Sequence, residues 1–373
     1  MATASFARRL GSAIKKAVKN KGSAWLSPHM VAASRAISER IPLVDLILEV
    51  RDARIPLASG YEQLRYFPSS SSRRIIVLNK ADLADRIQTQ EWMEYFEKQN
   101  SISYAVNSHN KESVKKFLNF LQAQARALKK SYPCGFMVTI MLVGIPNVGK
   151  SALANSLQQV GRIGAAEKGK LKHAVVSPHP GETKNISSLK IGSNPNVYIL
   201  DTPGILPSEN LDIEDCSKLA LTGAIMDNLV GEEELAPYFL SILNMSNEFK
   251  KWEKLSASQN DDLYAEDQAN CSSRSGSEPR LKKQYTTDHT QDFIVHEVRR
   301  TLFNKISTFG GNLEDENDML RLIDAQTMAL KEAFHVPAES DEKVFSKVST
   351  KLVNLYRTGR LGHYTLDPIP RKE

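Results

Sequence analysis

The stretch "GIPNVGKS" at residues 144–151 decides the fold. It matches the phosphate-loop pattern G-x-x-x-x-G-K-S, follows the buried-strand pattern "FMVTIMLVG" and precedes a helical pattern, which is the context that such a loop requires. Backbone N–H groups of the loop and the N-terminus of the following helix would hold phosphates. We expect Lys150 to reach the β- and γ-phosphates and Ser151 to bind Mg²⁺. The other loop residues expected to contact a nucleotide are Asn147, Val148, Gly149 and Ala152.

A second motif, "DTPG" at residues 201–204, follows the strand pattern "NVYILD" about fifty residues after the phosphate loop. Asp201 is expected to hold Mg²⁺ through water, and the amide of Gly204 to sense the γ-phosphate. Between the two motifs lies "PHPGETKN". We expect Thr183 in this segment to add a second hydroxyl ligand to Mg²⁺ and to close on the γ-phosphate, with a simple surface turn as the alternative. Lys150, Thr183 and Gly204 are the expected catalytic groups of these loops.

The motif that selects the base lies earlier in the chain, at "LNKAD". After Gly204 the nearest match to N-K-x-D is "NKIS", which has no aspartate. Asp82 would accept hydrogen bonds from the N1–H and N2 amino groups of guanine, a pair of donors that adenine lacks. Asn79 would support this loop, and the stem of Lys80 would lie on the base. A second base loop is expected about thirty residues on, at Asn107 and Ser108.

The chain therefore carries every motif of a guanine-nucleotide site once. The motifs follow the usual cyclic order, but the chain begins at the base loops and not at the phosphate loop. Strand patterns alternate with helical patterns up to residue 212, which predicts an α/β domain with a mostly parallel sheet and helices on both faces. After residue 212 the patterns are helical. We expect a transit segment at 1–24, a permuted nucleotide domain at 25–212 and an all-α domain at 213–373, interrupted by a polar, serine-rich disordered insertion at about 256–291.

The N-terminus is strongly basic. The net charge of the chain is +6, yet residues 1–38 contain seven Lys and Arg and no acid, so the remaining 42 bases and 43 acids nearly balance. Phe6, Leu10, Ile14 and Val18 recur every fourth residue and form one apolar helical face, as in organelle transit peptides. We expect import into the mitochondrial matrix, with the chloroplast, or a basic RNA-binding arm in the cytosol or nucleus, as alternatives. No apolar run approaches the roughly 20 residues of a membrane helix, so no integral membrane protein is expected.

Three further segments carry a family resemblance. They are "RDARIP" after the first strand pattern, "WLSPHM" at residues 25–30 and "YRTGRLGHYTLD" at residues 356–367. With the permuted motif order, they resemble the circularly permuted GTPases of the YlqF/YawG family, also called DAR GTPases, and within it the RbgA-like branch with its plant mitochondrial members. The resemblance implies a factor for assembly of the large ribosomal subunit, with a helical domain that contacts rRNA. Together with the motifs above, we expect a GTP hydrolase that uses GTP and Mg²⁺, has a slow intrinsic rate and acts as a monomer.

The resemblance also nominates two residues for the reaction. His29 matches the proposed catalytic histidine of the family, although Ser27–Pro28 replaces the usual Pro-Gly, and a structural role at the start of the first helix is the alternative. Asn147 matches an asparagine that holds K⁺ in similar GTPases. Such help is needed because Ile205 stands where Ras-like enzymes carry a water-orienting glutamine.

Three functions remain open from the sequence. The first is a GTPase switch in assembly of the mitochondrial large subunit. The second is a GTP-gated RNA-binding chaperone whose hydrolysis is incidental, and the third is a related factor of the chloroplast or nucleolus. Basic residues near the end of the chain are expected to contact rRNA phosphates, or else to form a solvated face with paired acids: Lys343, Lys347, Lys351, Arg357 and Arg360.

Overall fold

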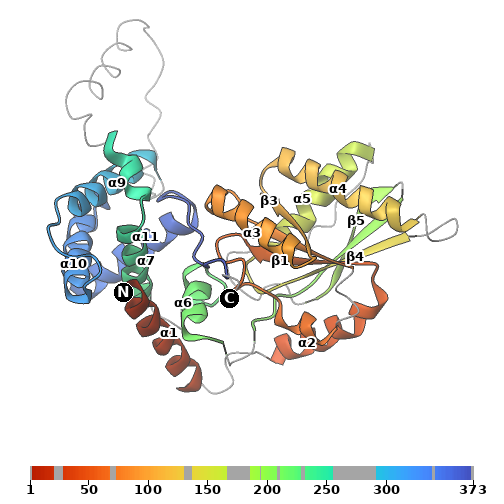
Figure 1. The fold of residues 1–373 in the computed structure, drawn as a ribbon, viewed down its shortest axis with the longest axis horizontal. Helices are drawn as coiled ribbons and strands as arrows, with labels where there is room; N and C mark the ends of the chain where they lie inside the picture. Colours follow the sequence, from red (N-terminus) through yellow and green to blue (C-terminus); the bar gives the residue numbers. More distant parts are fainter. Residues whose placement is uncertain are drawn as a thin grey trace, which may run out of the picture. The chain divides into compact units, whose positions relative to one another are not determined.

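The protein is seen in a computed structural model, which describes residues 2–20, 28–67, 73–129, 137–165, 185–193, 195–207, 211–227, 232–254, 291–337 and 341–370. A six-stranded sheet has the order β3-β2-β1-β4-β6-β5 (Figure 1). All neighbours are parallel except β5 and β6. The strands are β1 (Leu46–Asp52), β2 (Arg74–Asn79), β3 (Ile102–Val106), β4 (Met137–Val143), β5 (Ser187–Ser193) and β6 (Asn196–Asp201). The predicted α/β class with a mostly parallel sheet is confirmed.

The strand order is that of a circularly permuted chain. β4, the strand before the phosphate loop, lies inside the sheet between β1 and β6, although three strands precede it in the chain. The chain reaches β4 from the edge strand β3 through α4 (Lys111–Lys129). The strands that end in the base loops, β2 and β3, lie on the other side of β1 from β4, in the same parallel part of the sheet.

Helices cover both faces of this sheet. Paired residues of parallel strands share a face, so Ile47, Met141 and Ile76 lie on one side. Here α2 (Pro28–Arg40) and α3 (Arg86–Lys98) pack in two apolar clusters. Tyr104 of β3 lies on the other side, where its ring packs in tilted contacts against two phenylalanines of α4. The helix α5 (Lys150–Ala165) packs beside α4.

The chain divides into two compact units, but not at the expected place. The first, here the nucleotide unit, comprises Ala7–Gly231 and His363–Glu373; the second, the helical unit, comprises Met1–Phe6 and Glu232–Gly362. The boundary expected after residue 212 thus lies after residue 231, because α6 (Ile213–Leu221) is built into the nucleotide unit. The expected 1–24 segment contains the helix α1 (Ala2–Asn20), and residues 21–24 lie outside the described residues.

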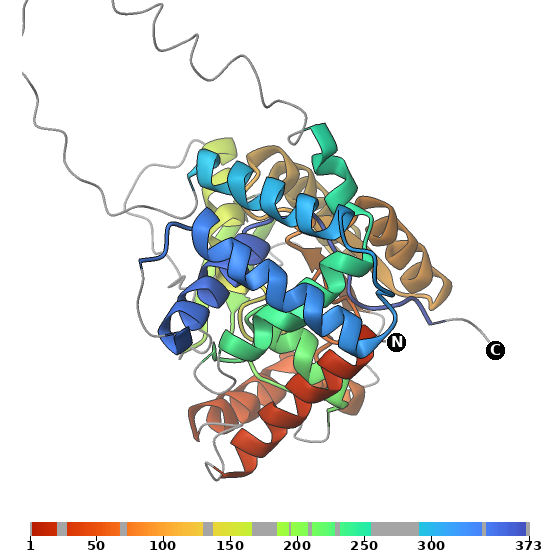
Figure 2. The same cartoon turned by 90° about the vertical axis from the view of Figure 1, so that its left-hand side faces the viewer.

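The helical unit is built from α7 (Glu232–Met245), α9 (Asp292–Ser307), α10 (Glu316–Ala333) and α11 (Asp341–Arg357). These helices are also drawn in Figure 2. One face of α11 is apolar and buried, at Val344, Val348, Leu352 and Leu355. The helix ends at Arg357, and Gly359 follows with φ of 73°. The expected insertion at 256–291 lies, except for its last residue, outside the described residues.

A polar pair specifies how two of these helices meet. Asn244 of α7 and Gln326 of α10 exchange two amide hydrogen bonds, at 3.1 and 2.7 Å, and both side chains are buried. A buried amide without its partner is costly, so this pair fixes one register between the helices. Three short 3₁₀ segments complete the described elements: Ile41–Leu43, Glu62–Tyr66 and Glu248–Trp252. None of the helices within the described ranges is long and apolar enough to cross a membrane.

Candidate nucleotide-binding site

The phosphate loop joins the buried strand β4 to the first turn of α5, which begins at Lys150. The Lys150 ammonium donates to the carbonyls of Gly144 (3.1 Å) and Ile145 (2.7 Å). Burial lowers the pKa of Lys150 to about 8, and the nearby Asp201 carboxylate opposes part of this shift. The cation is thus held inside its own loop, where the incoming phosphates would replace the two carbonyls as partners.

Two expected magnesium ligands already meet. Ser151 Oγ donates to Asp201 Oδ2 at 2.7 Å. Burial raises the pKa of the Asp201 carboxyl, against the bonds to Ser151 and the charge of Lys150. The second oxygen, Oδ1, is buried and has no hydrogen-bond partner within the described part of the chain. A buried carboxylate oxygen without a partner, beside a hydroxyl, fits a hard divalent cation such as Mg²⁺. Thr183, the third expected ligand, lies outside the described residues.

The "DTPG" loop lies directly against the phosphate loop. Ile205 N donates to the Gly144 carbonyl at 3.3 Å. A Cβ on Gly204 would stand 2.5 Å from Cα of Pro146, so only glycine fits at this approach. Thr202 Oγ1 anchors the loop by donating to the Leu142 carbonyl of β4 at 2.6 Å. The two loops are therefore in direct backbone contact at Gly204.

Asn79 joins the two base loops to the phosphate loop. Its Nδ2 donates to the Val148 carbonyl at 2.8 Å, and its Oδ1 accepts from Ser108 Oγ at 2.7 Å. Both side chains are buried. Asn107 holds the second base loop in shape by accepting from the His109 amide at 2.8 Å. Asp82 stays exposed at the rim. The base loops and the phosphate loop, which the chain separates by about seventy residues, form one site.

Sequence reasoning missed the residues that position Lys80. This lysine has φ of 58°, and its ammonium lies 3.0 Å from Asp52 Oδ2. Arg54 pairs with the same carboxylate through two hydrogen bonds, at 2.9 and 2.8 Å. These two charges and their hydrogen bonds hold the pKa of the buried Asp52 far below its usual range, against the effect of burial. Both acidic and basic partners belong to the "RDARIP" segment, which contains Asp52 and Arg54.

The chain's last segment adds another group that sequence reasoning did not identify. Asp367 is buried and accepts from the amides of Leu57 (2.7 Å) and Ala58 (2.9 Å) and from the ammonium of Lys218 on α6 (2.8 Å). The Leu366 amide donates to the Arg54 carbonyl at 2.7 Å. The closing motif thus fastens the segment after β1, whose Asp52 holds Lys80. Nothing in its local pattern indicated this, because the partners lie about 310 residues apart.

The end of α6 is tied to the same site from two directions. Arg54 donates to the carbonyl of Thr222 at 3.3 Å. Asn147 of the phosphate loop, with φ of 58°, donates through Nδ2 to the carbonyl of Gly223 at 2.8 Å. Because this nitrogen is a donor, the atom that could hold K⁺ is the side-chain carbonyl oxygen, Oδ1.

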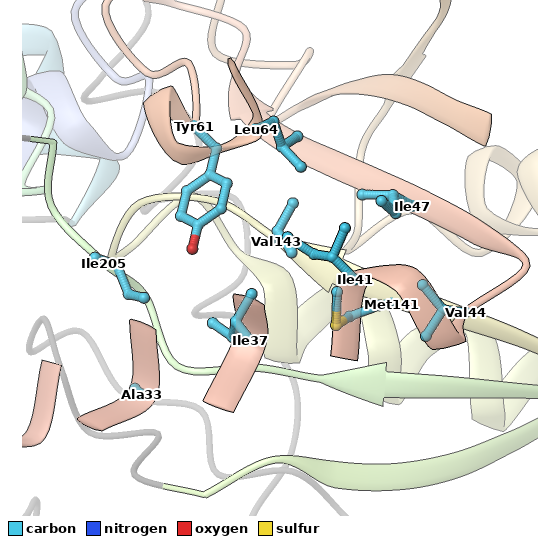
Figure 3. Packing of buried hydrophobic residues seen from close by; sticks show 10 residues of the cluster. All are labelled: Ala33, Ile37, Ile41, Val44, Ile47, Tyr61, Leu64, Met141, Val143 and Ile205. Carbon is cyan, nitrogen blue, oxygen red and sulfur yellow. The ribbon is translucent and has the colours of Figure 1, made fainter. Parts of the chain in front are cut away.

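His29 and Ile205 are linked through α2. Ile205 is buried in the cluster that contains Ala33 and Ile37 of this helix, and Figure 3 shows these side chains together. His29 is exposed one turn before Ala33 on the same helix. The residue after "DTPG" is therefore a core residue that cannot orient water, and the helix that carries His29 packs on it. Other members of the cluster are Ile41, Val44, Ile47, Tyr61, Leu64, Met141 and Val143.

The arrangement fits a nucleoside triphosphate with guanine as its base. Asp82 lies at the rim and can receive the base edge, while Asn79 and Ser108 fix the loops around it. Lys150 offers a cation that could bind phosphates, and Ser151 with Asp201 offers oxygen atoms that could bind Mg²⁺. The other expected phosphate-loop contacts, Val148, Gly149 and Ala152, occupy the turn and the start of α5.

Comparisons with known proteins agree with this description. A family model described as "50S ribosome-binding GTPase" matches residues 139–254. "DAR GTPase 2, mitochondrial" of Arabidopsis thaliana is 58% identical over 372 residues, covering 99% of this chain and 97% of the relative. "Short integuments 2, mitochondrial" of the same plant is 40% identical, covering 94% and 90%. "Ribosome biogenesis GTPase A" of Bacillus pumilus is 32% identical, covering 59% of this chain and 74% of the relative.

Proposed function

Because this chain belongs to the family of circularly permuted DAR GTPases, we propose that it binds and hydrolyses GTP as a switch in the assembly of the mitochondrial large ribosomal subunit. The observation that carries this proposal is the bonding of Asn79 to both Val148 and Ser108, which unites the base loops with the phosphate loop. The relatives' names supply the organelle and the ribosomal context. The basic, apolar-faced N-terminal helix supplies the import signal.

Each loop has its own proposed role in GTP binding and hydrolysis. Asp82 selects guanine, and Lys150 binds the β- and γ-phosphates. Ser151, Asp201 and Thr183 hold Mg²⁺, which, when bound, neutralises charge on the phosphate oxygens. The Gly204 amide donates to the γ-phosphate. Hydrolysis removes this phosphate and so frees the "DTPG" loop. Because Gly204 packs on Pro146 and is followed within ten residues by α6, this release acts on α6 first.

Ribosomal RNA is the proposed partner of the helical unit. Of the five basic residues expected to contact it, Lys343 and Lys347 are exposed on α11. Lys351 instead donates to the Phe334 carbonyl at 3.1 Å, and Arg360 pairs with Asp292 at 2.6 Å. Both alternatives therefore apply to different residues of this face. We propose that Lys343 and Lys347 contact rRNA phosphates, whereas Arg360 forms an ion pair with Asp292. We propose that the protein acts as a monomer on the subunit.

The switch proposal predicts that ribosomal subunits accelerate hydrolysis. GTP turnover by the full chain should rise at least about tenfold with mitochondrial large subunits, since a slow site without a water-orienting glutamine needs help from its target. Turnover should also be faster in K⁺ than in Na⁺, because K⁺ at Asn147 would add positive charge near the γ-phosphate. GTP binding without stimulation in either salt would instead favour a GTP-gated RNA-binding chaperone.

His29→Ala should lower subunit-stimulated turnover by about 10²-fold or more, the size of a lost proton-transferring or water-orienting group. GDP affinity and the midpoint of thermal unfolding should stay unchanged, because the side chain is exposed. Glu39→Ala, at an exposed position of the same helix, is the matched control and should leave turnover unchanged. A variant at His29 that loses stability but keeps its turnover would assign the histidine to the structure of the helix.

A further inference from the structure

The N-terminal helix α1 is drawn in red in Figures 1 and 2. A segment that served only as a targeting signal would leave its apolar face exposed, and α1 does not. Along that face Phe6, Leu10 and Ile14 are buried, the last two completely. Its basic side chains point outward at Arg8, Arg9, Lys16 and Lys19. The pattern that predicts a transit peptide is therefore also the pattern of a helix packed on a protein surface.

The surface that α1 covers is α6. The two backbones touch at Gly11, where a Cβ would stand 2.1 Å from the Ile213 carbonyl oxygen. Ser217 Oγ donates to the Ala7 carbonyl at 2.5 Å, and Arg8 lies 3.7 Å from Glu214. Because the nearest atom is the backbone oxygen of Ile213, a rotamer change of the Ile213 side chain would not make room for a larger residue. Backbone contact of this closeness belongs to a fixed packing of two helices.

The covered helix is part of the nucleotide site. α6 carries Lys218, the partner of Asp367, and ends beside Thr222 and Gly223, whose carbonyls accept from Arg54 and from Asn147. The first turn of α1 belongs to the helical unit. Within that unit, the Ser5 hydroxyl donates a hydrogen bond to the Glu316 carboxylate at 2.7 Å. Removing α1 would expose the apolar side of α6 and free a helix that holds the phosphate loop.

We propose that α1 stays in the mature protein as a permanent part of its fold, so that one segment first directs import and then folds onto α6. Only the import step rests on the proposed mitochondrial function. The docking of α1 on α6 stands on the geometry alone and is tested separately below.

The docking is tested by a change whose sign depends on it. Gly11→Ala stabilises a helix that is free in solution, since alanine is the better helix former. In the docked helix it should lower the midpoint of thermal unfolding of the full chain by at least about 4 °C, because the new Cβ meets the Ile213 carbonyl. Ser12→Ala, at the exposed neighbouring position, is the control and should not lower it. A midpoint that stays or rises with Gly11→Ala overturns the proposal.

A second variant guards against a protein that does not fold. Ser217→Ala removes only a hydroxyl on α6, and it should also lower the midpoint of thermal unfolding, by a smaller amount than Gly11→Ala.

Retention of α1 is measured in cells that express the full chain, by mass spectrometry of the N-terminal peptide of the mature protein. A first residue at or before Phe6 supports retention, and a later one overturns it. A protein found outside mitochondria would contradict the proposed function but would leave the Gly11 result intact.

Discussion

Asp82→Asn is expected to lower the affinity for GDP and GTP by about 10³-fold or more and to create affinity for xanthine nucleotides. Guanine presents donors at N1 and N2, and an asparagine nitrogen would place a third donor against them. Each buried polar group left without a partner costs about 1–3 kcal/mol, and sites built to bond a polar edge reject its wrong version by about 10⁴ or more. Xanthine carries a carbonyl at position 2, which accepts from the new amide.

This change should act on recognition alone. Asp82 is exposed, and within the described part of the chain it forms no hydrogen bond or ion pair, so the fold loses no contact. Asp85→Asn is the matched control. Its side chain caps α3 by accepting from the Gln88 amide at 2.9 Å, and asparagine caps helices equally well. Titrations with fluorescent GDP and XDP would check both variants; equal GDP affinity for Asp82→Asn and the unchanged chain would remove the aspartate from the base site.

The nucleotide loops could be read from the sequence because each is a short contiguous motif at the end of a strand. "GIPNVGKS" and "LNKAD" carry their chemistry within eight and five residues, and the sheet brings strand ends together in any chain order. The prediction of these loops therefore does not depend on the order of the motifs in the chain. Asn79 bonds to Val148 and Ser108 regardless of which segment the chain visits first.

The supporting contacts could not be read in this way, because their partners are far apart in the chain. Asp367 and Leu57 are 310 residues apart, and Asp52 meets Lys80 only through pairing of β1 with β2. The placement of α6 was misjudged for the same reason. Its sequence is helical and amphipathic, which fits either unit, and contacts with distant residues, such as the bond of Lys218 to Asp367 and the approach of Ile213 to Gly11, assign it. Periodicity predicts a helix and its buried face, but not what covers that face.

Lys150→Ala is the second large effect. The lysine should provide charge-assisted bonds to two phosphates, each worth about 1.5–3 kcal/mol, so GTP affinity at pH 7 should fall by at least about 10²-fold and turnover further still. The fold should persist, since the change removes a buried cation whose pKa burial has already lowered to about 8. Lys116→Ala, at an exposed position of α4, is the control and should bind GTP normally.

The pH dependence of binding separates this role from a structural one. In the empty site the ammonium loses its proton as the pH rises through about 8. Bound phosphates favour the charged form and raise the pKa of Lys150 in the complex, so binding above pH 8 takes up a proton. GTP affinity of the unchanged chain should therefore fall by up to about tenfold for each pH unit between 8 and that higher pKa. The Lys150→Ala variant lacks the group, and its weak affinity should stay level across this window, so that the two curves approach each other as the pH rises. Parallel curves would mean that the lysine does not meet the phosphates as a cation.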